Sequence, residues 1–413
     1  MRKKIAIVIY YTKENRYSYN ALLGALENLT FFDELEIFLC YKKDEFFSKI
    51  NDIKGKYERV IILLSFFTTQ LWEFREIIGK IREIKTENTY IVAGGPHPTG
   101  DPYGVLKMGC DYVAIGEGEE LILKLVGDIL AGKDIGDLIL KSENKFVDLD
   151  KFNPFSLKFG KFGPIEITRG CPFMCFYCQT PNIFGVKVRH RSVEKICELV
   201  EIMNKRNLKD IRFITPNAFS YGSKDGKNIN LKEIERLLEN IRRIIGKSGK
   251  IYFGTFPSEV RPEHVNDDTI RLIKEYTDND NLVIGAQSGS PRILKLINRG
   301  HTVDDVYNAV EIIIKNNLKA NVDIIFGLPY EEEEDIKLTI KFILDLTKMG
   351  AKVHAHTFMP LPQTFFEKMP AGKINNELLK TLNKLIPKGL VFGNWKKQEE
   401  LGKKIEEYLK TKT

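Results

Sequence analysis

Three cysteines lie close together near the middle of the 413-residue chain: Cys171, Cys175 and Cys178. They directly follow an extended segment at 164–168 and have the spacing Cys-x3-Cys-x2-Cys. A closed cubane iron–sulfur cluster takes four cysteine ligands, so three thiolates leave one corner of such a cluster without a protein ligand. The spacing therefore predicts an iron–sulfur cluster with one position open to another molecule.

Other uses of clustered cysteines fit this pattern less well. A disulfide would leave one of the three thiols over. Zinc could take the three cysteines and His190, but structural zinc sites usually draw their ligands from two short pairs, and the sequence has no second pair. A non-catalytic cluster protein, such as a redox sensor or an electron carrier, remains an alternative that would need a fourth cluster ligand.

The residues around the cysteines resemble those of the radical S-adenosylmethionine (SAM) enzymes. Tyr177 stands just before the third cysteine, and Arg169-Gly170 stand just before the first. In that family the cysteines hold a [4Fe-4S] cluster, and the amino and carboxylate groups of SAM chelate the open iron. Reductive cleavage of SAM then yields a 5′-deoxyadenosyl radical. The resemblance implies a one-electron reductant of the flavodoxin or ferredoxin type.

The cysteines belong to the first of six predicted strand–helix units. Apolar extended segments alternate with helical patterns from residue 164 onward, and the predicted strands are 165–168, 211–215, 250–255, 281–286, 321–326 and 352–358. This alternation predicts a partial (βα)6 TIM-type barrel, open on one side, with its chemistry in the loops at the carboxyl ends of the strands.

The loops after these strands are polar and glycine-rich, and they contain Thr-Pro-Asn at 215–217, Gln-Ser-Gly-Ser at 287–290 and Asp-Ile-Ile-Phe-Gly-Leu-Pro at 323–329. These segments resemble the radical SAM subgroup that includes the methylthiotransferases. The resemblance implies that Arg299 pairs with the SAM carboxylate, a role that suits the two-pronged guanidinium. Glu259 and Arg261 could instead be solvated loop charges, and Arg299 could form an ordinary ion pair. The implied cofactor-binding residues are Tyr177 near adenine, Pro216 and Asn217 at the methionine amino group, Ser258 and Glu259 at the ribose, Gln287 and Ser288 on the cavity wall, and Arg299.

Two further groups of polar residues invite a functional interpretation. His354 and His356 alternate on the sixth predicted strand, so both face the same side, either the barrel interior or its exterior. They would serve as a proton donor or substrate contact in the first case and as packing in the second. The acidic run at 331–335 opens a predicted helix after Pro329, and we interpret it as helix capping rather than as a metal site.

The first third of the chain has a different organisation. Short apolar runs at 5–10, 35–39, 60–64, 90–93 and 112–115 alternate with helical patterns such as 19–29 and 71–84. The alternation predicts a doubly wound parallel sheet of Rossmann-like type, which binds ligands beyond the carboxyl ends of its strands.

Loops in this region resemble the cobalamin-binding domain attached to many radical SAM enzymes, through Gly-Gly-Pro-His at 94–97 and Gly-Glu-Gly-Glu at 116–119. The pattern Asp-x-His-x-x-Gly, which supplies a histidine to cobalt, is absent. Cobalamin would therefore bind without a histidine lower ligand, or the domain has lost the cofactor and only covers the active site. We interpret His97 as a structural turn residue. The implied cobalamin-binding residues are Ser65, Gly94, Gly95, Gly116 and Gly118.

These observations divide the chain into four predicted parts. They are a Rossmann-like domain at 1–140, a linker at 141–161, a barrel at 162–362 and a helical appendage at 363–413. The net charge of +7 arises from 63 basic and 56 acidic residues, so nucleic-acid binding is not indicated. No segment is long enough to span a bilayer, and the clustered cysteines favour a reducing compartment, so we expect a cytoplasmic protein.

The leading functional hypothesis is a radical SAM enzyme that methylates an unidentified substrate with the help of cobalamin. Methylthiolation and radical rearrangement remain alternatives within the same chemistry. Against methylthiolation, the N-terminal half contributes only Cys40 and Cys110, which are too few for the second three-cysteine cluster of that family.

Overall fold

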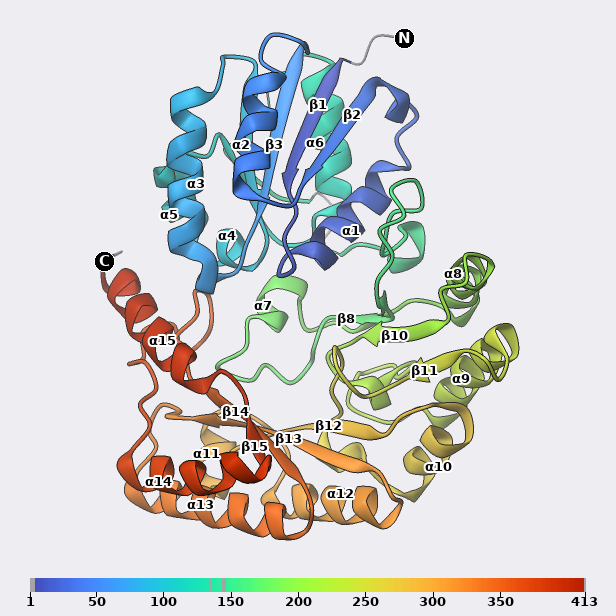
Figure 1. Ribbon diagram of the computed structural model, residues 1–413, viewed down its shortest axis with the longest axis vertical. Helices are drawn as coiled ribbons and strands as arrows, with labels where there is room; N and C mark the ends of the chain where they lie inside the picture. Colours follow the sequence, from blue (N-terminus) through green and yellow to red (C-terminus); the bar gives the residue numbers. More distant parts are fainter. Residues whose placement is uncertain (1–3, 134, 143–145, 412–413) are drawn as a thin grey trace. The chain divides into compact units, whose positions relative to one another are not determined.

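The computed structural model describes residues 4–133, 135–142 and 146–411, and its contacts divide the chain into two units, Met1–Gly163 and Pro164–Thr413. Each unit is a layered α/β structure, coloured blue to green and green to red in Figure 1. Residues 141–142 and 146–161 of the predicted linker fall within the first unit, and residues 143–145 lie outside the described part. No helix in the described part is both long and apolar enough to cross a membrane.

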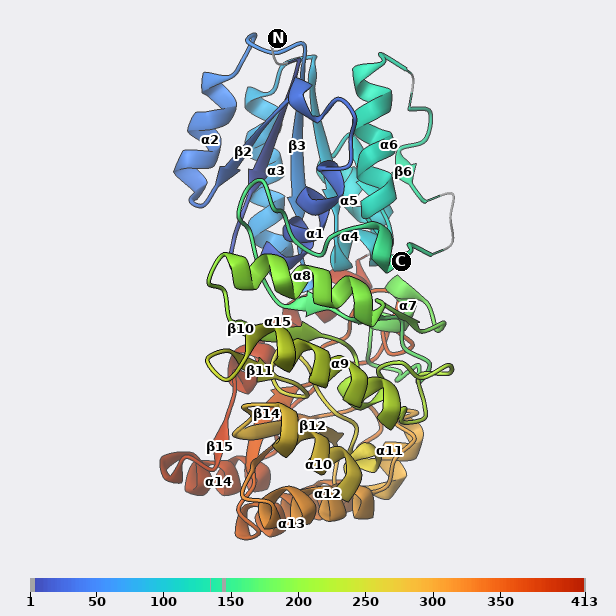
Figure 2. The ribbon, with the colours of Figure 1, turned by 90° about the vertical axis from the view of Figure 1, so that its right-hand side faces the viewer.

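The first unit contains a parallel six-stranded sheet, as the sequence predicts, with strand order β2-β1-β3-β4-β5-β6. Helices α1 and α6 cover one face, and α2 and α3 cover the other (Figure 2). The strands are β1 (Ile5–Tyr10), β2 (Leu35–Cys40), β3 (Arg59–Ser65), β4 (Thr89–Gly94), β5 (Tyr112–Ala114) and β6 (Ile139–Leu140). The helices are α1 (Arg16–Leu26), α2 (Lys43–Asp52), α3 (Leu71–Ile84), α4 (Pro96–Gly100), α5 (Pro102–Met108) and α6 (Glu119–Leu130).

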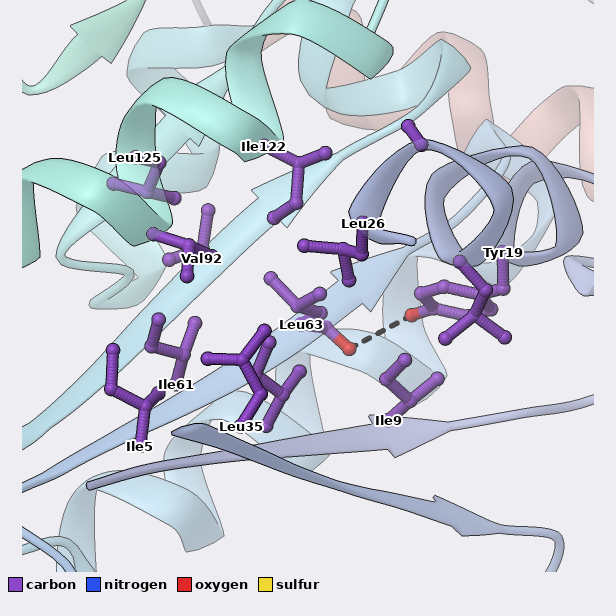
Figure 3. Packing of buried hydrophobic residues seen from close by; sticks show 14 of the residues in the cluster. Ile5, Ile9, Tyr19, Leu26, Leu35, Ile61, Leu63, Val92, Ile122 and Leu125 are labelled. Atoms are coloured by element: carbon purple, nitrogen blue, oxygen red, sulfur yellow. Dashed lines mark hydrogen bonds between the residues drawn. The ribbon is translucent and has the colours of Figure 1, made fainter. Parts of the chain in front are cut away.

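The core of this unit explains why its central strands are continuous apolar runs. Every residue of β1 is buried, because helices pack on both faces of the sheet. Between the sheet and helices α1 and α6, aliphatic side chains interlock around Tyr19, as Figure 3 shows. The Tyr19 hydroxyl donates to the Leu63 carbonyl oxygen at 2.8 Å, which satisfies the one polar group of this side chain.

The second unit forms an open arc of parallel strands with helices on the outside (Figure 1). One sheet has the order β11-β10-β7 and the next has the order β12-β13-β14-β15, and the Val260–Ile284 bridge connects them. The strands are β7 (Ile165–Glu166), β8 (Thr168–Arg169), β9 (Arg189–His190), β10 (Asp210–Ile214), β11 (Lys250–Tyr252), β12 (Asn281–Gln287), β13 (Lys319–Phe326), β14 (Lys352–Thr357) and β15 (Val391–Phe392). The helices are α7 (Thr180–Phe184), α8 (Val193–Lys205), α9 (Leu231–Ile245), α10 (Asp267–Tyr276), α11 (Pro291–Leu296), α12 (Val303–Lys315), α13 (Glu333–Lys348), α14 (Asn376–Leu385) and α15 (Trp395–Lys410).

This arc confirms the predicted partial barrel and adds a seventh, short strand. β15 comes from the C-terminal segment and pairs in parallel with β14. The acidic run acts as the sequence predicts: Glu332 caps α13, and Asp335 accepts a hydrogen bond from the Glu332 backbone N–H. Asp335 also accepts from the Ser290 hydroxyl at 2.5 Å and so fastens the loop after β12 to α13.

Candidate active site

The cysteine loop follows the short strand β8 and is held by backbone hydrogen bonds on both sides. Cys171 N donates to Gly185 O at 3.1 Å, and Cys178 N donates to Cys175 O at 3.0 Å. Gly170 has a φ of +88°, and a Cβ atom there would lie 2.3 Å from Lys187 O, so only glycine fits. The Arg-Gly pair before the first cysteine therefore turns the chain from β8 into the loop.

The three thiols converge on one cavity of about 380 Å³. All three are free thiols, and burial raises the pKa of Cys171 and raises that of Cys178 to about 11. His190 cannot complete a zinc site here, because its ring nitrogens contact Thr168 Oγ1 at 2.9 Å and Ser223 O at 2.8 Å. Three sulfur donors facing an open cavity fit a [4Fe-4S] cluster with one uncovered corner.

Arg299 lies beside the cysteines and is 8% exposed. Its Nη2 donates to Gly285 O at 2.5 Å, its Nε contacts His301 Nε2 at 3.2 Å, and its Nη1 lies 3.7 Å from Cys175 Sγ. Burial alone would lower the pKa of this guanidinium, but Tyr177, Cys175 and Glu259 together raise it. Arg299 is thus a permanent positive charge beside the cluster ligands.

Glu259 lines the same cavity, and its side chain is exposed to solvent there. Desolvation by the protein around the carboxyl group, followed by the negative charge of Asp323, raises its pKa to about 7, while Arg299 opposes the shift. A Cβ atom on Gly285 would come within 2.9 Å of Glu259 Oε2 and within 2.5 Å of Arg299 Nη2. The absence of a side chain at Gly285 therefore leaves room for both charged side chains.

A cluster of polar side chains from β13 and β14 forms another part of the wall. Asp323 Oδ1 lies 2.9 Å from His354 Nδ1, and His356 Nε2 lies 3.2 Å from the same nitrogen. Gln398, from α15, contacts His356 Nδ1 at 3.3 Å. Both histidines therefore face the barrel interior, which is one of the two orientations that the sequence allowed.

The structure brings five of the eight residues expected around SAM to the cavity wall: Tyr177, Pro216, Glu259, Gln287 and Arg299. The other three, Asn217, Ser258 and Ser288, are buried in the turns behind it. Asn217 contacts His264 Nδ1 at 2.8 Å, Ser258 donates to Phe213 O at 2.7 Å, and Ser288 lies 3.5 Å from the Thr339 hydroxyl. These three side chains stabilise the turns at the strand ends and do not face the cavity.

The sequence did not indicate that Arg261, Asp323 and Gln398 lie at or beside the cavity. Arg261 is no solvated loop charge: it is 3% exposed, lies 3.5 Å from the Phe173 ring centroid and donates to Arg299 O at 2.6 Å. Asp323 and Gln398 also line the cavity. Asp323 lies beside His354 in the parallel register of β13 and β14, a pairing between strands that the sequence does not display, and nothing in the pattern of α15 marks Gln398.

In the first unit, the predicted cobalamin-binding residues lie in three neighbouring loops at the carboxyl end of the sheet, after β3, β4 and β5. Phe66 N donates to Gly94 O at 3.3 Å, and Gly116 N donates to Thr99 Oγ1 at 3.1 Å. Gly95 has a φ of +94°, and a Cβ atom there would lie 2.8 Å from Ser65 Oγ. The close backbone approach at this edge, where Gly118 begins α6, suits a ligand held by main-chain groups.

His97 is the one histidine among the first 163 residues. It is fully buried, its ring lies 5.5 Å from that of Phe66, and its Nδ1 contacts Thr68 Oγ1 at 3.1 Å. These contacts support its interpretation as a structural turn residue. The donor set of this unit therefore fits cobalamin only without a histidine below the cobalt.

Comparison with known families agrees with these two sites. A family model described as the radical SAM superfamily matches residues 165–343, and one described as a B12 binding domain matches residues 24–126. The chain contains a radical SAM domain and a B12-binding domain. Its cofactors are thus a [4Fe-4S] cluster, SAM and cobalamin, and its chemistry requires a one-electron reductant.

Relatives of this protein include an uncharacterised methyltransferase of Pyrococcus horikoshii, 28% identical over 83% of the chain and 75% of the relative. A tRNA-2-methylthio-N(6)-dimethylallyladenosine synthase of Sulfurihydrogenibium is 31% identical, over 59% of the chain and 54% of that enzyme. Among solved structures, the methyltransferase TsrM of Kitasatospora setae matches with a TM-score of 0.69 at 16% identity, over 90% of this chain and 78% of TsrM. The cobalamin-dependent enzyme OxsB matches with a TM-score of 0.63 at 15% identity, over 82% of this chain and 51% of OxsB. At these identities the two structures support the fold.

Proposed function

We propose that this protein is a cobalamin-dependent radical SAM methyltransferase that acts on a small or flexible substrate entering the barrel cavity. The single observation that carries the proposal is the convergence of Cys171, Cys175, Cys178 and Arg299 on one cavity, in a chain that also has a B12-binding domain. The names of the P. horikoshii relative and of TsrM agree with methyl transfer.

When bound, the cluster and SAM supply a radical, and cobalamin supplies a carrier for a methyl group. The three cysteines would hold the cluster and leave it one position for SAM. Arg299 holds a positive charge where the SAM carboxylate would lie, and Gly285 O and His301 fix the orientation of its guanidinium. Pro216 and Tyr177 provide apolar surface for SAM, while Glu259 offers an oxygen to its ribose or its ammonium group.

Methylthiolation is the less favoured reaction. Cys40 and Cys110 are each buried, and Cys40 ends β2 whereas Cys110 stands before β5. A second three-cysteine cluster therefore has no ligand set within the described part of the first unit. We place the electron transfer with a flavodoxin or ferredoxin and the protein in the cytoplasm, where free thiols persist.

The test is anaerobic reconstitution with iron, sulfide and cobalamin, followed by incubation with methyl-deuterated SAM, a reductant and a small-molecule extract of the source cells. We expect bound cobalt, 5′-deoxyadenosine, and a product that carries the label. Protein that takes up no cobalt, or that cleaves SAM without labelling any product under these conditions, would contradict the methyl-transfer proposal. The variant Cys175→Ala serves as the control, because it removes a cluster ligand.

A further inference from the structure

Asp323, His354 and His356 form a compact group on the cavity wall that the binding of SAM and cobalamin leaves unexplained. Their nearest polar atoms, Asp323 Oδ1, His354 Nδ1 and His356 Nε2, are separated by 2.9, 3.2 and 4.0 Å. The two histidines are partly exposed, and Asp323 and His356 line the cavity. All three could therefore offer a lone pair to a shared partner at the edge of the cavity.

Hydrogen bonding alone does not satisfy this group. Asp323 and His356 both approach the same atom, His354 Nδ1, which carries either one proton or one lone pair. A proton on Nδ1 that points at Asp323 leaves the contact with His356 bent, and a lone pair on Nδ1 repels the charged carboxylate. No arrangement of protons gives both contacts a straight hydrogen bond.

A cation resolves the conflict, because it accepts all three lone pairs at once. A triangle with sides of 2.9, 3.2 and 4.0 Å has a circumscribed radius of about 2.0 Å, and imidazole or carboxylate binds zinc at about 2.0–2.2 Å. A metal ion close to the plane of these atoms would lie at bonding distance from every donor, and side-chain rotations without a change of backbone would have to bring the Asp323 and His356 donors closer together for a tetrahedral arrangement.

We infer that Asp323, His354 and His356 bind a first-row divalent metal ion at the wall of the barrel cavity. Two imidazoles and one carboxylate suit zinc or ferrous iron, whereas magnesium and calcium prefer sites made of oxygen ligands. This donor set, free of sulfur, also separates the site chemically from the cysteines, which select an iron–sulfur cluster.

The neighbouring residues support the ligands from behind. His354 stacks on Phe392 of β15 with ring centroids 4.7 Å apart and planes 10° apart. Gln398 contacts His356 Nδ1 at 3.3 Å and the Thr357 N–H at 3.0 Å. A metal-ligating histidine donates a hydrogen bond from its other ring nitrogen. A metal on His356 Nε2 would place this proton on Nδ1, so the Gln398 NH2 group, whose amide oxygen accepts from the Thr357 N–H, would have to move away from that nitrogen.

Three protein ligands leave further positions on the metal ion open, and such positions bind water or substrate. Because Asp323 and His356 line the cavity, these positions face the space where a substrate would enter. If the proposed function holds, the metal would anchor a substrate through an oxygen or nitrogen donor, such as a carboxylate. The metal site itself does not depend on methyl transfer.

The experiment measures zinc binding to the full chain with its cluster already reconstituted, so that the cysteines are occupied. Zinc affinity is determined by competition with a chromophoric chelator, and the ligands are identified by zinc X-ray absorption. We expect one zinc per chain in a shell of nitrogen and oxygen at about 2.0–2.1 Å. His354→Ala, His356→Ala and Asp323→Asn should each weaken zinc binding at least tenfold.

His190→Asn provides the matched control, since it changes a histidine of the same unit that lies away from the cavity, and it should retain zinc. Cluster content and thermal unfolding report whether each variant is folded. A shell of sulfur at about 2.3 Å, less than half an equivalent of zinc, or equal affinity in the three variants would overturn the site. The zinc-binding assay contains neither SAM nor a reductant. Its result can therefore be interpreted even if the proposed methyl transfer fails.

Discussion

At the scale of single residues, Arg299 combines a fixed orientation with a position beside the cluster ligands. Lysine would keep the charge but offers one nitrogen in place of the guanidinium that now contacts Gly285 O, His301 and Cys175. We expect Arg299→Lys to load iron normally and to bind SAM about tenfold more weakly, a loss of about 1.4 kcal/mol. Equilibrium dialysis of cluster-loaded protein measures this, with Arg271→Lys at the exposed surface as the control. Unchanged SAM affinity in Arg299→Lys would remove the carboxylate role.

Glu259 makes the free energy of unfolding of the chain depend on pH. Its pKa in the folded chain is raised to about 7, against the ordinary value of 4.5, because desolvation by the surrounding protein and the charge of Asp323 disfavour its charge, and solvent at the exposed side chain screens part of this effect. The folded state therefore holds this proton more tightly than the unfolded state. Its contribution to stability is fully present below pH 4.5 and is lost as the pH rises through about 7.

Glu259→Gln places a permanently neutral group at the same position. We expect the wild-type chain, without SAM, to lose thermal stability relative to Glu259→Gln as the pH rises from about 5 to about 8. Melting temperatures of the two proteins, measured side by side across this range, report Glu259 together with the groups it interacts with, because the titrations of all distant groups cancel. A difference that does not vary with pH would show that the carboxyl group is ionised throughout.

At the scale of elements, helix α1 packs unusually close to residues 153–158, which lie near the end of the first unit. A Cβ atom on Gly24 would lie 2.5 Å from Asn153 O and 2.8 Å from Phe155 O, both backbone atoms. Glu27, which directly follows this helix, accepts hydrogen bonds from Leu157 N at 3.2 Å and Lys158 N at 2.8 Å. This segment is therefore part of the first unit rather than a free tether.

We expect Gly24→Ala to destabilise the first unit by about 1–3 kcal/mol, because the helix must move away from fixed backbone. Gly79→Ala in α3 is the matched control, since a Cβ atom there meets nothing within 4 Å. Alanine should stabilise that exposed helix position by up to about 1 kcal/mol. Urea unfolding of both variants measures the contrast, and equal effects would contradict the packing argument.

The periodicity of apolar residues in the sequence predicted those helices and strands that bury regularly spaced apolar side chains. The sequence predicted strand 5–10 and helix 71–84 with the bounds that the structure has, because their apolar spacing reflects burial. It missed β6 and β15, each two residues long, since so short an edge strand carries no pattern. The candidate site divides in the same way: the cysteine spacing is local, whereas Asp323 and Gln398 meet the other wall residues only through tertiary folding.

At the scale of the whole molecule, the histidines are distributed unevenly between the two units. The first unit has only His97, which is buried, and the other five histidines belong to the second unit. We expect bound cob(II)alamin to show no nitrogen coupling from a protein imidazole in its electron paramagnetic resonance spectrum. Labelling histidine with nitrogen-15 should leave the spectrum unchanged. A change in hyperfine splitting on labelling would identify a histidine ligand to cobalt.

Part of the cavity wall comes from late in the chain: β15 extends the barrel sheet, and Gln398 contacts Thr357 and His356. The three cysteines precede these residues by more than half the length of the second unit. During synthesis the thiols therefore emerge well before the segment that completes the cavity, and a domain folds as a unit only once its parts are available. A cluster inserted early would sit exposed to oxidants and competing metals, so its protection is acquired late in biosynthesis.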